Sequence, residues 1–146
     1  LAGETVQPNI VHSRDAAKDT LEVLKAWQMH KTGGVIHCFS YTKEIAREYL
    51  NMDYYFGIGG VLTFKNAKKL VEAVSYIPMN RILLETDCPY LAPEPYRGKR
   101  NQSSYIKYVA QRLAEIKGLG EEEVLAQTMR NAKEFYGISG AQAISD

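Results

Sequence analysis

The segment Ile82–Asn101, ILLETDCPYLAPEPYRGKRN, decides the fold class because a short apolar run ends abruptly in acidic residues. The run Ile82–Leu84 is typical of a strand that is buried on both faces, as in parallel sheets. Alternate residues of a strand share a face, so Leu83, Glu85 and Asp87 are predicted to point the same way. Two carboxylates at the end of a buried strand are costly unless a positive group meets them. The segment therefore predicts either surface carboxylates that an arginine holds or a site for a cation.

The rest of the chain alternates short apolar runs with amphipathic helical patterns. Such alternation predicts an α/β fold with a parallel sheet, and about half of a TIM (β/α)₈ barrel would fit in 146 residues. An additional helix is expected at the C-terminus. The predicted strands are 9–12, 35–39, 54–58 and 82–85. Asp15 and Thr42 are predicted to cap the first two helices, the third follows Asn66, and the last two occupy 103–117 and 121–136.

The overall composition excludes several classes of protein. The 18 Lys and Arg nearly balance the 17 Asp and Glu, so a cationic binding site has to be local. Two cysteines, Cys38 and Cys88, are too few for a disulfide scaffold and indicate a reducing compartment, the cytoplasm. No run approaches the roughly 20 apolar residues of a membrane span, and no signal peptide is visible. Both thiols directly follow candidate ligands and are predicted to be buried and to face the helices.

Three polar side chains occupy the carboxyl ends of predicted strands. His12, His37 and Asp87 each follow an apolar run with the inward parity of its strand. Functional groups of parallel α/β folds gather at this edge, and neighbouring strands lie about 4.8 Å apart. Imidazole and carboxylate groups suit zinc or manganese, so one or two divalent cations are predicted here. The alternative is that each histidine is a hydrogen-bonded core residue.

A cluster of cations follows Asp87 by about ten residues. Arg97, Lys99 and Arg100 surround a glycine and are predicted to lie in a loop at the rim of the sheet. Arginine forks suit phosphate oxygens, and Arg14 could add another cation at the same rim. The alternative is a solvated cationic loop without a ligand.

Four motifs, in order along the chain, resemble the TatD family of metal-dependent deoxyribonucleases. They are IVHSRDA (10–16), VIHCFS (35–40), LLETDCPYLAP (83–93) and RGKRN (97–101), and the resemblance runs from about Asn9 to Ile138. It implies a (β/α)₈ barrel that cleaves DNA phosphodiester bonds with two divalent ions, Mg, Mn or Zn. It further implies that His12 and His37 are metal ligands and that Asp87 is a ligand near the attacking water. Glu85, expected beside the site, joins Asp87 as the second candidate catalytic residue.

The chain departs from the family pattern in what it lacks. The opening H-x-H strand and a later bridging glutamate of the family are absent, so residues 1–138 resemble the C-terminal half of the barrel, strands five to eight, followed by a polar tail at 139–146. Tyr41 stands where the family usually has glycine, and it would crowd the loop or stack on a base. We therefore expect the isolated chain to be an inactive fragment with a partial or empty metal site. Its expected partners are DNA, as single strands or ends, and a second copy or the missing half.

Two other functions remain open from the sequence. Related barrels hydrolyse amides, esters or lactones with similar ligands, although a neutral substrate needs no cluster of three cations. The chain could also be a noncatalytic remnant that keeps the fold by inheritance. Comparing the hydrolysis of a panel of amides with the cleavage of single-stranded DNA would separate the two enzymatic alternatives.

Overall fold

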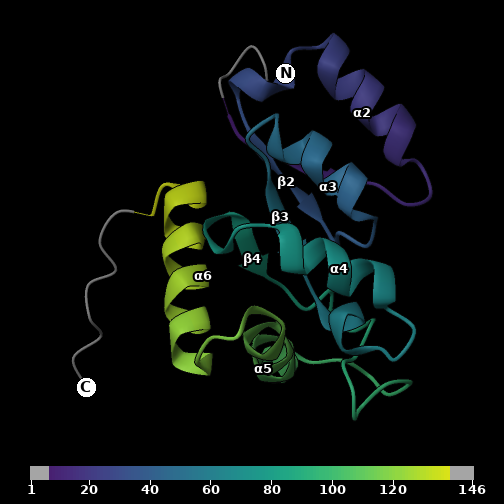
Figure 1. Cartoon of the computed structure of the whole chain (residues 1–146), viewed down its shortest axis with the longest axis vertical. Helices are drawn as coiled ribbons and strands as arrows, with labels where there is room; N and C mark the ends of the chain where they lie inside the picture. Colours follow the sequence, from purple (N-terminus) through teal and green to yellow (C-terminus); the bar gives the residue numbers. More distant parts are fainter. Residues whose placement is uncertain (1–6, 139–146) are drawn as a thin grey trace.

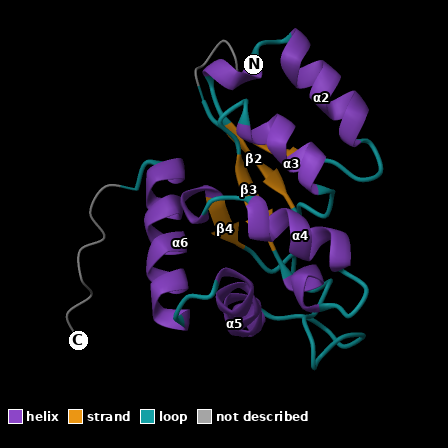
Figure 2. Ribbon diagram, viewed as in Figure 1, coloured by secondary structure: helices purple, strands orange, loops and turns teal. Residues whose placement is uncertain are grey.

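The computed structural model describes residues 7–138 as four parallel strands that alternate with helices (Figures 1 and 2). The strand order is β1-β2-β3-β4, so the chain adds one strand at a time to the same side of the sheet. This confirms the predicted α/β class with four parallel strands and an additional C-terminal helix. The strands are β1 (Asn9–His12), β2 (Gly34–His37), β3 (Tyr55–Ile58) and β4 (Ile82–Leu84), and the helices are α2 (Ala17–Ala26), α3 (Lys43–Leu50), α4 (Lys68–Tyr76), α5 (Ile106–Lys117) and α6 (Glu121–Tyr136).

The register of the strands aligns their carboxyl ends. His12 of β1 is level with His37 of β2, and Ile58 of β3 is level with Leu84 of β4. Side chains that follow these positions therefore meet at one edge of the sheet, as parallel strands require. The predicted tail at 139–146 lies outside the described residues. Within residues 7–138, no helix is both long enough and apolar enough to cross a bilayer.

The main core lies between the sheet and the helices on one of its faces. Ile36, Phe56, Ile58 and Ile82 are fully buried and point toward this layer. Helices α3, α4 and α5 lie side by side over the face (Figure 1). Burying large side chains of this kind contributes roughly 2 kcal/mol each, so this layer supplies most of the stability of the fold.

The second face of the sheet is partly covered by α6, which runs beside β4 (Figure 1). Val35, Tyr55 and Leu83 form a smaller apolar cluster, against which Ala132 and Phe135 of α6 pack. Strand parity places His37 and Glu85 on the face of Val35 and Leu83. The candidate site therefore lies on this second face, beyond the apolar cluster.

A buried asparagine joins α6 to the start of β4. The Asn131 side chain is 1% exposed and donates hydrogen bonds to the carbonyls of Met79 (2.7 Å) and Ile82 (2.8 Å). Its oxygen accepts a hydrogen bond from Gln127. Unpaired buried carbonyls cost about 1–3 kcal/mol each, so this amide fixes the helix against the last strand.

Two details of the predicted helix starts are wrong. Asp15 does not cap α2, because the N-cap is Ala16 and Asp15 has a left-handed φ of 54°. Thr42 does occupy the N-cap of α3, but its side chain makes no capping hydrogen bond. These ends are fixed by the loops that lead into them, which a helical pattern alone does not describe.

Candidate metal centre at the strand ends

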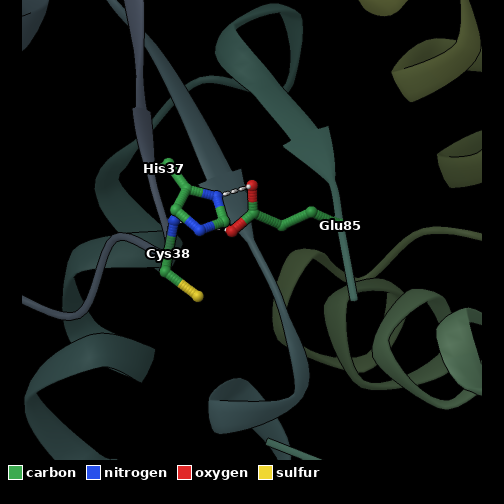
Figure 3. A group of neighbouring side chains, drawn as sticks. All are labelled: His37, Cys38 and Glu85. Atoms are coloured by element: carbon green, nitrogen blue, oxygen red, sulfur yellow. Dashed lines mark hydrogen bonds and ion pairs between the residues drawn. The ribbon is translucent and has the colours of Figure 1, made fainter. Parts of the chain in front are cut away.

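The imidazole of His37 lies between two carboxylates. Its Nδ1 is 2.9 Å from Oε2 of Glu85, and its Nε2 is 3.4 Å from Oδ1 of Asp87. Figure 3 shows the Glu85 carboxylate directed at the His37 ring. The alternative in which an arginine holds these carboxylates is wrong, because among residues 7–138 the side chain that contacts both of them is this histidine.

Glu85 is held in place by the backbone of the neighbouring strand. Its Oε1 accepts a hydrogen bond of 2.6 Å from the backbone N–H of Cys38, while its Oε2 meets His37. Gly57 on β3 leaves room for this arrangement, since a methyl group there would overlap the Glu85 carboxylate. A glycine at this strand position is therefore required for Glu85 to reach β2.

Among the three predicted ligands, His37 adjoins each of the other two at the strand ends. The rings of His12 and His37 have centroids 5.8 Å apart, and Asp87 adjoins the Nε2 side of His37. A histidine that binds a metal through one nitrogen usually donates the other N–H to a carboxylate, which is the relation between His37 and Glu85. Two imidazoles and one carboxylate fit a divalent cation such as zinc or manganese.

The Cys38 thiol lies on the same face of the sheet as the candidate site, so the prediction that it faces the helices is wrong. Its Sγ and the ligand atoms of His37 and Glu85 all lie within 4.8 Å of one another (Figure 3). The cause is a left-handed φ of 50° at Cys38, which ends β2 and breaks the alternation of faces. Burial, and then the charge of Glu85, raise the pKa of the Cys38 thiol, and this disfavours the thiolate that binds metals.

Cys88 is exposed, which contradicts its predicted burial. It follows Asp87, whose φ of 53° turns the chain away from the sheet. Hydrogen bonds with Thr86 and then Ser103 lower the pKa of the Cys88 thiol. The alternation of faces along β4 therefore no longer holds at Cys88.

Asn101 was missed by the sequence interpretation and fixes the loop that carries Asp87. The side chain is 3% exposed and donates to the carbonyls of Thr86 (2.6 Å) and Tyr90 (2.7 Å), on either side of Asp87. The backbone N–H of Asn101 donates to the carbonyl of Pro89 (2.9 Å). The signal in the sequence is a lone amide at the end of RGKRN, directly after the three cations.

Among the ion pairs of residues 7–138, none joins a predicted cation to Glu85 or Asp87. Arg97 places its guanidinium 4.3 Å from the centre of the Phe64 ring, and Lys99, Arg100 and Arg14 are exposed. A turn from Tyr96 to Lys99 contains Gly98 at a φ of 83°. The loop is therefore built around one stacked arginine, and a role in binding phosphate stays a prediction.

Tyr41 joins the two loops that follow the histidine strands. Its hydroxyl is 2.9 Å from Oγ of Ser13 and accepts a hydrogen bond of 3.4 Å from the backbone N–H of Ala16. Its ring meets that of Phe39 edge-on, with centroids 5.9 Å apart. In this structure the tyrosine therefore fastens the loop after β1 to the loop after β2.

A family model and several known proteins match most of this chain. A family model described as TatD related DNase matches residues 1–137. The uncharacterized metal-dependent hydrolase YabD of Bacillus subtilis (strain 168) is 48% identical over 139 residues, which are 95% of this chain and 54% of the relative. The uncharacterized metal-dependent hydrolase YcfH of Escherichia coli (strain K12) is 41% identical over 139 residues, or 95% of this chain and 52% of that protein. The chain thus spans about half the length of the curated relatives that it matches.

Solved structures agree with the fold. The crystal structure of YjjV, a TatD homolog from Escherichia coli K12, matches with a TM-score of 0.86 at 26% identity, over 94% of this chain and 53% of that one. A hydrolase TatD family protein from Entamoeba histolytica matches with a TM-score of 0.77 at 24% identity, over 88% of this chain and 50% of that one. The second likeness supports the fold alone.

Proposed function

Since this chain belongs to the family of TatD-related DNases, we propose that it supplies the His12, His37 and Asp87 part of a metal-dependent hydrolase that cleaves DNA phosphodiester bonds. The observation that carries the proposal is the placement of His37 between Glu85 and Asp87. One carboxylate can orient the ring while the other shares a cation with it. A purely structural histidine would not need a carboxylate at each nitrogen.

His12, His37 and Asp87 would hold one or two divalent ions, of which Mg, Mn and Zn are candidates. Such an ion lowers the pKa of bound water and polarises a phosphoryl oxygen. The Asp87 carboxylate accepts the proton of the attacking water. Glu85 keeps the His37 ring oriented through Nδ1, as a positioning residue.

The substrate is bound by charge rather than by base identity. Arg97, Lys99, Arg100 and Arg14 would contact phosphates at the rim, and such contacts carry no sequence information. Single strands or strand ends are the substrates that we propose, in keeping with the match to the TatD-related DNases. A cytoplasmic location accords with two cysteines that are both free.

We further propose that residues 1–138 form half of a closed barrel, corresponding to strands five to eight. The remaining ligands would come from the half of the relatives that this chain does not match. The isolated chain then has a partial metal site and no appreciable nuclease activity. A noncatalytic remnant would retain the fold but would fail the following test.

The test uses a hybrid protein in which residues 1–137 of this chain replace the matching segment of the 48%-identical Bacillus subtilis relative. With manganese, the hybrid protein is expected to degrade single-stranded DNA, and EDTA is expected to abolish the reaction. A panel of amides, esters and lactones serves as the rival substrate set. Hydrolysis of that panel without DNA cleavage, or an inert hybrid beside an active parent, would contradict the proposal.

A further inference from the structure

A strongly cationic surface surrounds α4, on the helical side of the sheet and away from His37. Four adjoining hollows, of about 290–550 Å³ each, are lined by α3, α4, α5 and the loop before α4. Two carboxylates, Glu44 and Glu72, lie among these lining residues, and Arg112 is paired with Glu115 at 2.7 Å. The whole chain has a net charge of only +1. The excess of cations on this surface therefore reflects where the charges are placed and not a basic composition. The six cations of this α4 cationic surface are Lys43, Arg47, Lys65, Lys68, Lys69 and Arg112.

The stability of helix α4 does not explain why two lysines occupy its first turn. Lys68 and Lys69 occupy the first turn of the helix, which contains no acidic residue. Cations at a helix N-terminus oppose the helix dipole and disfavour the helix by some tenths of a kcal/mol. Within residues 7–138, neither these two lysines nor the exposed Lys65 has an ion-pair partner. The three ammonium groups are therefore available to an external anion.

The α4 cationic surface is continuous with the loop that follows Asp87. Phe64 lines two of the hollows and carries the Arg97 guanidinium on its ring. The backbone N–H of Glu94 donates to the Thr63 hydroxyl (2.9 Å), which fixes the loop to the segment before α4. Figure 1 shows the first turn of α4 on the same side of the molecule as the loop between β4 and α5. Cations thus extend from the rim of the site along the outside of the sheet.

We propose that the α4 cationic surface binds the sugar-phosphate backbone of a nucleic-acid strand that extends beyond the bond being cleaved. The proposal rests on the proposed function for the direction of the strand, but the binding itself needs no metal. A row of cations that contact phosphates binds any sequence, and its affinity falls steeply with salt. Longer strands would therefore bind more tightly than strands that reach only the rim loop.

The experiment measures binding of labelled single-stranded DNA to the 146-residue chain by fluorescence anisotropy, in EDTA. The variant combines Lys65→Gln, Lys68→Gln and Lys69→Gln. The matched control removes the same charge elsewhere, with Lys18→Gln, Lys31→Gln and Lys133→Gln at exposed positions. Circular dichroism melting checks that all three proteins are folded. The affinity of each protein is measured for a 6-nucleotide and for a 20-nucleotide strand.

For the 20-nucleotide strand, the α4 variant should bind about tenfold or more weakly at low salt, and its log-log salt slope should fall by about 2, or roughly 0.7 per lost phosphate contact. The 6-nucleotide strand and the control variant should change little. Equal losses in the α4 variant and the control would overturn the proposal, as would full competition by polyglutamate at equal charge. Because EDTA prevents cleavage, an inactive hybrid protein would leave this result unaffected.

Discussion

Changing Asp87 to Asn should lower kcat for DNA cleavage by the hybrid protein by a factor of about 10² to 10⁴, the usual contribution of a general base. The amide cannot accept the proton of the attacking water, and it is a poorer ligand than a carboxylate. Asparagine tolerates the left-handed backbone of residue 87, whose φ is 53°, so the loop should keep its conformation. The loss should therefore appear in kcat without unfolding.

The matched control for this substitution is Asp19→Asn. Asp19 is exposed in the first turn of α2, far in the sequence from the site, and its replacement removes the same charge. Steady-state cleavage of a labelled single strand, at saturating manganese, gives kcat and KM for both variants. A kcat for Asp87→Asn within about threefold of that of the control would show that this carboxylate does not act in the reaction.

The isolated 146-residue chain should self-associate and should show no measurable nuclease activity. β1 and β4 are the two ends of the sheet, and within the described residues no further strand pairs with either of them. Ile10 on β1 is 63% exposed, and the apolar side chains on the second face that α6 covers are those of the cluster of Val35, Tyr55 and Leu83. Open strand edges beside exposed apolar side chains favour pairing with another chain.

Light scattering should therefore give about twice the monomer mass of 16.5 kDa. Ile10→Lys should shift the population toward the monomer, because a charge on an edge strand opposes pairing. Val23→Lys, at a position 56% exposed on α2, is the control and should leave the mass unchanged. A stable monomer that cleaves DNA unaided would contradict both parts of this prediction.

The elements of the fold were largely predictable from local patterns. Apolar runs bounded by polar residues located all four strands to within about two residues at each end, and Gly137, at a φ of 63°, ends α6 as its position suggested. The pattern of a helix does not specify its partner, however. Nothing in the sequence of α6 indicated that Phe135 would pack against Tyr55 on the second face of the sheet.

The candidate site was predictable only in part, because strand parity ends where the strand ends. His12 and His37 were correctly expected at one edge, since they close strands in parallel register. Cys38 was misplaced because a left-handed backbone reverses its direction. Asn101 was missed because its partners, Thr86 and Tyr90, are brought to it by the folded loop and share no sequence pattern with it.

His12, His37 and Asp87 are expected to bind a divalent cation, and isothermal titration calorimetry with zinc measures that binding. The 146-residue chain is compared with His37→Ala and with His30→Ala, a control in the turn Met29–Lys31. The unmodified chain and the control should bind zinc weakly but measurably, and His37→Ala should lose at least about tenfold in affinity. Equal zinc binding by all three proteins would contradict the assignment of this metal centre.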